Sequence, residues 1–316
     1  MPATIAEYEK AMDLFRNGDP DGNGAKDTYG MSNSMFKNIY AAYGLTSVPG
    51  DHTNMTALKQ QEDGSMVFSC ATDRAKEVLA LLADWYSKGY IDPEYITGEN
   101  RGGYTHLSLA YTTGTIGVSG LGYFYHWYPE TSSVADELTA NGLAINYVPG
   151  VPIVGPYGDS GATQRSLEAN SVLITSVGAE KPRVLDTALA ILNKMYSDDE
   201  DYYVLNTYGI EGVHWAYDDK GERVSLLGDV NPRRVGIEVL TFASQNPDMS
   251  RRFAGALYSE WGDKYFAYPG LITPSVVPAK DYADANARYL QDLTKLTTET
   301  FTAIVTGAQS VDTFDA

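Results

Sequence analysis

The stretch DPDGNGAKD, residues 19–27, decides how the rest of this 316-residue sequence is interpreted. Side-chain oxygens fall at its first, third, fifth and ninth positions, and Gly24 falls at the sixth, where an EF-hand loop turns sharply. Calcium takes about six to eight oxygen ligands. The spacing therefore predicts a structural Ca²⁺ site formed by Asp19, Asp21, Asn23, the Ala25 carbonyl and Asp27, with water completing the shell.

This loop differs from an EF-hand at its twelfth position. An EF-hand has a bidentate glutamate there, whereas this sequence has Gly30. The loop must therefore be closed in some other way. The alternative interpretation is a solvated turn, because Asp, Asn and Gly are also common turn residues.

Composition and charge narrow the classes of function. The net charge of −18 argues against nucleic acid and anionic membrane surfaces as partners, because both require a basic surface. The single cysteine, Cys70, excludes a disulfide framework, and the four histidines form no zinc-binding motif. No stretch reaches the roughly 18 apolar residues of a membrane-spanning helix, so we expect no transmembrane segment in this chain.

Hydrophobic spacing predicts elements on both sides of the loop. A capping box at Thr4–Glu7 begins a helix that Gly18 ends. A second helix begins at Thr72 or Asp73, ends at Gly89, and places Ala75, Val78, Leu79, Leu82 and Tyr86 on one face. Further elements are a glycine turn and buried strand within 110–118, a strand at 171–175, a helix at 182–196, a hairpin at 215–224 and helical patterns at 232–245 and 280–306.

Six consecutive aromatic or imidazole side chains occupy residues 123–128, directly after the expected strand. They cannot all face a core, so ordinary packing and a ligand cleft both remain open. Tyrosine and tryptophan present flat apolar faces with a polar tip, which suits the C–H face of a sugar.

Four strings together resemble one family, the extracellular solute-binding proteins (family 1 type) of bacterial ABC importers for sugars and oligosaccharides. The subgroup most similar to this sequence carries a calcium loop and includes the alginate-oligosaccharide binders. In that loop the residue after the last Asp is often acidic, and here it is Thr28, which would weaken the site or make Asp27 bidentate. The strings are DPDGNGAKDTYG at 19–30, GYIDPEYIT at 89–97, YGIEGVHW at 208–215 and TGAQSVDTFD at 306–315.

The resemblance implies an α/β fold of the type II, two-lobed periplasmic-binding-protein-like kind, with ligand held between hinged lobes. It also implies a chain truncated at both ends, with an incomplete first lobe. Residues 1–168 would form the first part of lobe two with the calcium loop, 169–225 a remnant of lobe one, and 226–316 the helical second part of lobe two. Leu173, Leu189 and Leu192 of the remnant would then be exposed.

The function implied is the non-enzymatic substrate-binding component of an ABC transporter, which captures an oligosaccharide and delivers it to permease subunits. The full-length protein would be extracellular, as a membrane-anchored lipoprotein, or periplasmic. The implied ligand-binding residues are Tyr123, Tyr125 and Trp127 as stacking platforms, Arg165 as a hydrogen-bond donor, and Trp215 and Trp261 as further candidates.

Three alternatives remain open. A glycoside hydrolase or lyase would need two carboxylates at a set distance, for which Glu260 and Asp263 beside Trp261 are the candidates. A dockerin-type module would use calcium loops for protein interaction, although dockerins carry two loops in a short domain. A receptor for a cationic or peptide solute would agree with the acidic balance and the aromatic content.

Overall fold

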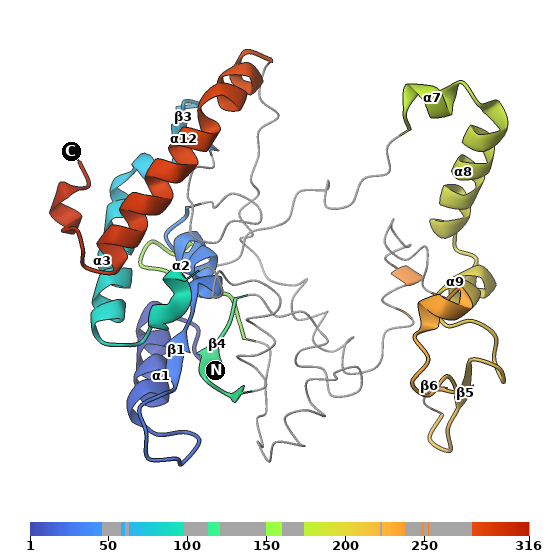
Figure 1. Ribbon diagram of the computed structural model, residues 1–316, viewed down its shortest axis with the longest axis horizontal. Helices are drawn as coiled ribbons and strands as arrows, with labels where there is room; N and C mark the ends of the chain where they lie inside the picture. The colour runs from blue at the N-terminus through green and yellow to red at the C-terminus, as the bar shows by residue number, and fades with distance from the viewer. Residues whose placement is uncertain are drawn as a thin grey trace. The chain divides into compact units, whose positions relative to one another are not determined.

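A computed structural model describes residues 1–45, 58–60, 63–97, 113–120, 150–159, 174–221, 223–237, 248–249, 252 and 280–315. The chain divides into two units (Figure 1). Unit 1 comprises Met1–Ser166 and Tyr265–Ala316, and unit 2 comprises Leu167–Lys264. The lobe boundaries expected at 168 and 225 stay a prediction.

Unit 1 begins with the helix that the capping box predicts. α1 spans Ile5–Asn17. The Glu7 N–H donates to Thr4 Oγ1 (3.3 Å), and the Glu7 carboxylate accepts from the Thr4 N–H (3.1 Å). Gly18 caps the helix C-terminus, as expected, and Met12 lies on the buried face. The predicted calcium loop therefore starts where α1 ends.

Two short parallel strands join segments that lie far apart in the sequence. β1 (Tyr29–Met31) follows the loop, and β4 (Ile116–Val118) is the strand expected after the glycine turn, with Gly114 at φ +68°. A Cβ on Gly117 would lie 2.2 Å from the Phe15 ring, so β4 packs directly against α1. The register pairs Tyr29 with Ile116 and Met31 with Val118, and Met31 also bridges Ile91 in parallel on the other side.

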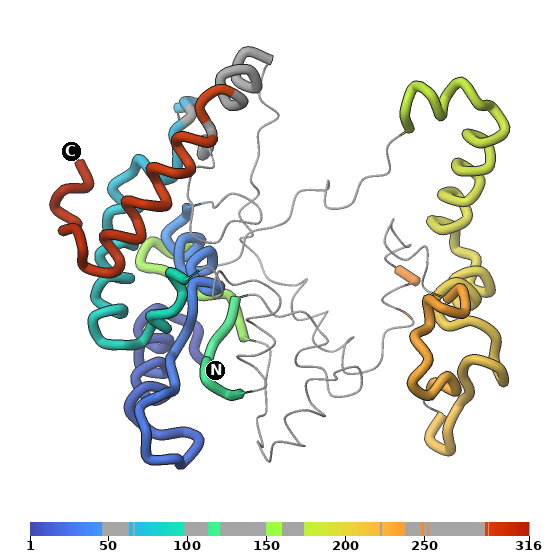
Figure 2. Tube along the Cα trace, in the orientation of Figure 1, coloured from blue at the N-terminus to red at the C-terminus, as the bar shows by residue number. Residues whose placement is uncertain are grey.

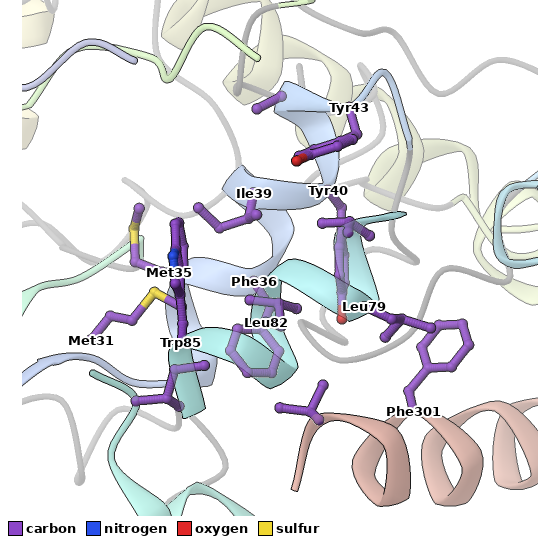
Figure 3. Close-up of a cluster of buried hydrophobic side chains, with 14 of the residues drawn as sticks. Met31, Met35, Phe36, Ile39, Tyr40, Tyr43, Leu79, Leu82, Trp85 and Phe301 are labelled. Atoms are coloured by element: carbon purple, nitrogen blue, oxygen red, sulfur yellow. The ribbon is translucent and has the colours of Figure 1, made fainter. Parts of the chain in front are cut away.

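The core of unit 1 lies between four helices, α1, two that follow β1, and the long C-terminal helix, together with β1. After β1 come the 3₁₀ turn η1 (Asn33–Met35) and α2 (Phe36–Ala42). α3 spans Asp73–Ser87, with Thr72 as its N-cap. Figure 3 shows the side chains of these elements converging, with Trp85 beside Met31 and Met35, and Phe36 near Leu82.

The predicted apolar face of α3 is confirmed at Ala75, Val78, Leu79 and Leu82, all of which are buried. The expectation is wrong in one respect, because Trp85 is the fully buried aromatic of this helix and Tyr86 is only partly buried. The two residues are adjacent, and the larger apolar ring takes the position that faces the core.

The long C-terminal helix closes the core. α12 spans Lys280–Val305, in agreement with the helical pattern at 280–306. It runs alongside α3 (Figures 1 and 2) and buries Phe301, Ile304 and Val305. The hairpin β2 (Leu58–Gln60) and β3 (Met66–Phe68) is antiparallel, and the remaining 3₁₀ turns of unit 1 are η2 (Ser69–Ala71), η3 (Pro93–Ile96) and η6 (Val311–Thr313).

Unit 2 consists of helices followed by the expected hairpin. α7 (Ser176–Ala179) leads to α8 (Pro182–Met195), which has proline in its first turn as predicted, and to α9 (Glu200–Thr207). β5 (Trp215–Tyr217) and β6 (Arg223–Ser225) pair antiparallel, and η5 (Pro232–Val235) follows. Of the helical pattern predicted at 232–245, the described residues include this 3₁₀ turn, and 238–245 lie outside them.

α8 carries Leu189 and Leu192, two of the residues expected to be exposed in an incomplete lobe one. Met195 is buried, whereas Leu189 is 40 % exposed and Leu192 is half-buried. Leu173 and most of the expected strand at 171–175 lie outside the described residues. Unit 2 thus presents an amphipathic helix whose apolar side has few contacts with the described part of the chain.

Candidate functional site

The predicted calcium loop has the backbone that its glycines require. Gly24, at the expected sharp turn, has φ +77°, and Gly22 has φ +68°. Asp19 is also left-handed, at φ +49°, a conformation that aspartate adopts more readily than most residues. The loop therefore curls back toward α1.

The side chain of Asn23 lies among the carboxylates of the loop. Its amide nitrogen donates to Asp21 Oδ2 (2.8 Å) and to Asp27 Oδ2 (3.1 Å), while its carbonyl oxygen accepts from the Ala25 N–H (2.6 Å). The amide hydrogens carry partial positive charge, so they occupy the place where a cation would meet these two carboxylates. Three of the five predicted ligand residues are thus brought together.

Asp19 supplies the observation that tests whether a cation fits. Its Oδ2 accepts from the Gly24 N–H (3.1 Å), whereas its Oδ1 is buried and has no hydrogen-bond partner. A buried carboxylate oxygen without a partner is costly and calls for a donor or a cation. Across the described residues, however, no three His, Cys, Asp or Glu side chains lie close enough to hold a metal ion. Because Asn23 turns its amide nitrogen toward Asp21 and Asp27, binding of a cation here would require it to turn its oxygen toward them instead.

The loop is closed by contacts with α1 and β1. The Thr28 hydroxyl donates to the Phe15 carbonyl (2.5 Å), and Arg16 donates to the Lys26 carbonyl (2.6 Å). Thr28 is buried and committed to this bond, so it is not a metal ligand. Gly30, at the twelfth position, lies against Met12, whose side chain would be 2.4 Å from a Cβ.

Most of the residues expected to bind ligand are not among those that the structure describes. Tyr123, Tyr125, Trp127, Arg165 and Trp261 lie outside the described residues, as do Glu260 and Asp263 of the hydrolase alternative.

Trp215 is the described member of that set. It is buried in β5, its indole N–H donates to the Gly209 carbonyl (3.2 Å), and its ring meets Tyr217 edge-on at 5.2 Å. Arg223 lies 5.1 Å from the same ring. These contacts hold the hairpin together.

Sequence reasoning missed a polar cluster that we call the carboxyl edge. Because β1 and β4 are parallel, the residues that follow them meet at one edge of the sheet. Ser34 Oγ lies 3.1 Å from Ser119 Oγ and 3.2 Å from Ser32 Oγ. The signal in the sequence was the run of small polar residues after a buried strand. The edge comprises Ser32, Asn33, Ser34, Asp92, Ser119 and Gly120.

No known protein family matches this chain in a comparison of family profiles. A stretch of 100 residues is 35 % identical to the fructooligosaccharide ABC transporter substrate-binding protein FusA of Streptococcus pneumoniae. That stretch is 30 % of this chain and 18 % of FusA.

Solved structures resemble the whole chain. The alginate-binding protein AlgQ2, solved without calcium ion, superimposes with a TM-score of 0.62 at 17 % identity. FusA in complex with kestose gives 0.59 at 20 % identity, and an HMO-binding, ABC-transporter-associated solute-binding protein from Bifidobacterium longum infantis gives 0.54 at 15 % identity. Each match covers all of this chain, which spans only 64–65 % of the length of those proteins.

The fold is therefore α/β and of the two-lobed solute-binding-protein type, as expected. The resemblance to sugar-binding proteins of ABC importers is confirmed by FusA in sequence and by AlgQ2 and FusA in structure.

Proposed function

We propose that this chain is part of the substrate-binding component of an ABC importer and captures an oligosaccharide without transforming it. The observation that carries the proposal is the agreement of two independent comparisons, since FusA is similar in sequence over 100 residues and in fold over the whole chain. The relatives are named as binders of fructooligosaccharides, alginate and HMOs. An uncharged or anionic oligosaccharide is thus the expected class of solute.

The proposed setting follows from that role. The protein delivers its sugar to permease subunits at the outer face of the membrane, in an extracellular lipoprotein form or in a periplasm. Among the described residues, no helix is both long and apolar enough to cross a membrane. Stacking on Tyr123, Tyr125 and Trp127, with Arg165 as a donor, remains our proposal for the ligand cleft, and residues 169–225 remain our proposal for the contribution of lobe one.

We further propose a structural Ca²⁺ in the loop at 19–27. Its support is the partnerless Oδ1 of Asp19 and the position of the Asn23 amide between two carboxylates. The names of the relatives mention a calcium ion for AlgQ2 and an EF-hand for FusA. With Asn23 turned, Asp19, Asp21, Asn23, Asp27 and the Ala25 carbonyl would hold the ion and join α1 to β1.

The test of the function is binding measured together with turnover. Calorimetry of the chain with kestose, maltotriose, xylotriose and an alginate-derived trimer should show binding of at least one sugar. Chromatography of the same mixtures should show the sugar unchanged after prolonged incubation. Appearance of a shorter or unsaturated product would establish an enzyme, and binding of cationic peptides alone would establish the alternative receptor.

A further inference from the structure

The carboxyl edge of β1 and β4 is lined by buried polar side chains, of which Ser32 caps η1 by accepting from the Ser34 N–H. Ser32, Asn33 and Ser34 are almost fully buried, at 0 %, 2 % and 0 % exposure. In open α/β sheets, ligands bind beyond the carboxyl ends of the strands. A cluster of buried polar side chains at that edge is therefore a candidate for contact with the solute.

Asn33 is the residue whose hydrogen bonds are incomplete. Its Oδ1 is buried and has no hydrogen-bond partner. Leaving such a group unsatisfied destabilises the folded protein, and buried amides in native structures nearly always find partners. A ligand hydroxyl that donates to Oδ1 would satisfy the group.

The serines next to Asn33 extend the same chemistry across two strands. The hydroxyls of Ser32, Ser34 and Ser119 form a continuous chain with spacings of 3.2 and 3.1 Å, and Ser119 at its end is half-buried. Gly120 leaves no room for a side chain, because a Cβ would lie 2.5 Å from the Ser34 carbonyl. The ends of β1 and β4 are thus held in close contact, which fixes the hydroxyls relative to Asn33.

The charge at this edge distinguishes between classes of sugar. Asp92 follows the segment that bridges Met31, and its N–H donates to the Met31 carbonyl (2.9 Å). Its carboxylate caps η3 by accepting from the Glu94 N–H (2.9 Å), so a fixed negative charge stands beside this edge. Hydroxyls and an amide match the hydroxyl groups of an uncharged sugar, whereas a uronate beside this carboxylate would need cationic partners. The net charge of −18 also disfavours an anionic sugar, because like charges repel.

We infer that the carboxyl edge is a hydrogen-bonding subsite for an uncharged, hydroxyl-rich oligosaccharide, with Asn33 as its specificity-determining residue. The inference rests on the proposed function. It separates this chain from binders of acidic sugars such as alginate and assigns the choice to residues that directly follow β1 and β4.

The test compares two probes and two variants of the chain. Calorimetry should show an uncharged trisaccharide (kestose, maltotriose or xylotriose) binding at least tenfold more tightly than an alginate-derived trimer. Asn33→Leu, in which the new side chain has a similar volume, should lower the affinity for the best uncharged probe about tenfold. A loss of that size corresponds to one good hydrogen bond. Its melting temperature should be unchanged or higher, because an apolar group replaces an unsatisfied amide.

Thr297→Val is the matched control. Thr297 is a buried polar residue of α12 whose hydroxyl donates to the Leu293 carbonyl, so the variant removes a hydrogen bond away from the edge. It should leave sugar affinity unchanged. A lowered melting temperature with unchanged affinity in Asn33→Leu would make Asn33 structural and overturn the inference, as would tighter binding of the uronate. Failure of the unmodified chain to bind any probe would overturn the proposed function, and the inference with it.

Discussion

Gly30 occupies the position at which an EF-hand places its bidentate glutamate, and packing explains the difference. The residue lies in β1 directly over Met12 of α1, and a Cβ would approach the Met12 side chain to 2.4 and 2.5 Å. A glutamate there would separate the strand from the helix. The loop keeps the oxygen spacing of an EF-hand only over its first nine positions and then becomes part of the core.

Gly30→Ala tests this packing. The added methyl group overpacks the junction of α1 and β1, so we expect a loss of about 1–3 kcal/mol in the free energy of unfolding, measured with urea. The double variant Met12→Ala with Gly30→Ala should lose somewhat less than the sum of the single variants, because it removes the contact with Met12 Cγ at 2.4 Å while the contact with the residue-12 Cβ at 2.5 Å stays. Additive losses would show that the contact is relieved by a backbone shift.

Asp21→Ala tests the proposed calcium site. The melting temperature of the unmodified chain should rise in millimolar calcium and fall again in EDTA, since an ion bound only to the folded state at about 100 times its Kd adds about 2.7 kcal/mol. The variant should lose the calcium response and match the unmodified chain in EDTA. Asp63→Ala is the control, because Asp63 also accepts hydrogen bonds in an Asp turn but lies outside the loop. A chain indifferent to EDTA would make the loop only a turn.

At the scale of elements, the sequence predicts what depends on neighbours along the chain. The capping box, Gly18 and the face of α3 all follow from local spacing, and all are observed. The pairing of β1 with β4 joins residues more than eighty positions apart, and such parallel pairing has no local signal. The carboxyl edge was missed for the same reason, since the serine bridge from Ser34 to Ser119 exists only once the strands are paired.

The start of α1 gives a prediction for this scale. Thr4→Ala removes the side-chain acceptor for the Glu7 N–H and should lower the free energy of unfolding by about 1 kcal/mol. The backbone N–H groups of Ala3 and Thr4 hold the pKa of Glu7 below its ordinary value. A carboxyl whose folded-state pKa is lowered stabilises the protein above its unfolded-state pKa, and that contribution is lost as the pH falls through the folded-state pKa.

Glu7→Gln isolates the ionic part of the capping box. The amide oxygen can still accept from the backbone, but the group no longer titrates. We expect the variant to lack the part of the acid-induced loss of stability that Glu7 contributes as the pH falls below the ordinary pKa of a glutamate, as followed by urea unfolding at several pH values. Identical pH profiles for the variant and the unmodified chain would contradict a contribution from this carboxylate.

At the scale of the whole molecule, the two units differ in how well they bury their apolar side chains. Unit 1 has a continuous core. Its fully buried side chains, at 0 % exposure, include Ile39, Leu79, Leu82 and Trp85. In unit 2, α8 has Val184 at 58 % and Leu189 and Ile191 at 40 % exposure. The spacing of apolar residues marks one side of α8 as apolar. Whether that side is buried depends on a partner surface, which the spacing along one helix cannot reveal.

The last prediction concerns that exposed face. Contiguous apolar surface of this kind binds apolar dyes and promotes association. The chain should therefore enhance anilinonaphthalene sulfonate fluorescence and sediment with a concentration-dependent apparent mass. Leu189→Lys should reduce both effects, because it places a charge on the apolar side of the helix. Leu296→Lys is the matched control, since Leu296 is an exposed leucine of α12 in unit 1, at 63 %, and this change should have little effect on either. A monodisperse chain that takes up no dye would show that α8 is covered within the chain itself, and equal effects of the two variants would show that the face has no special role in association.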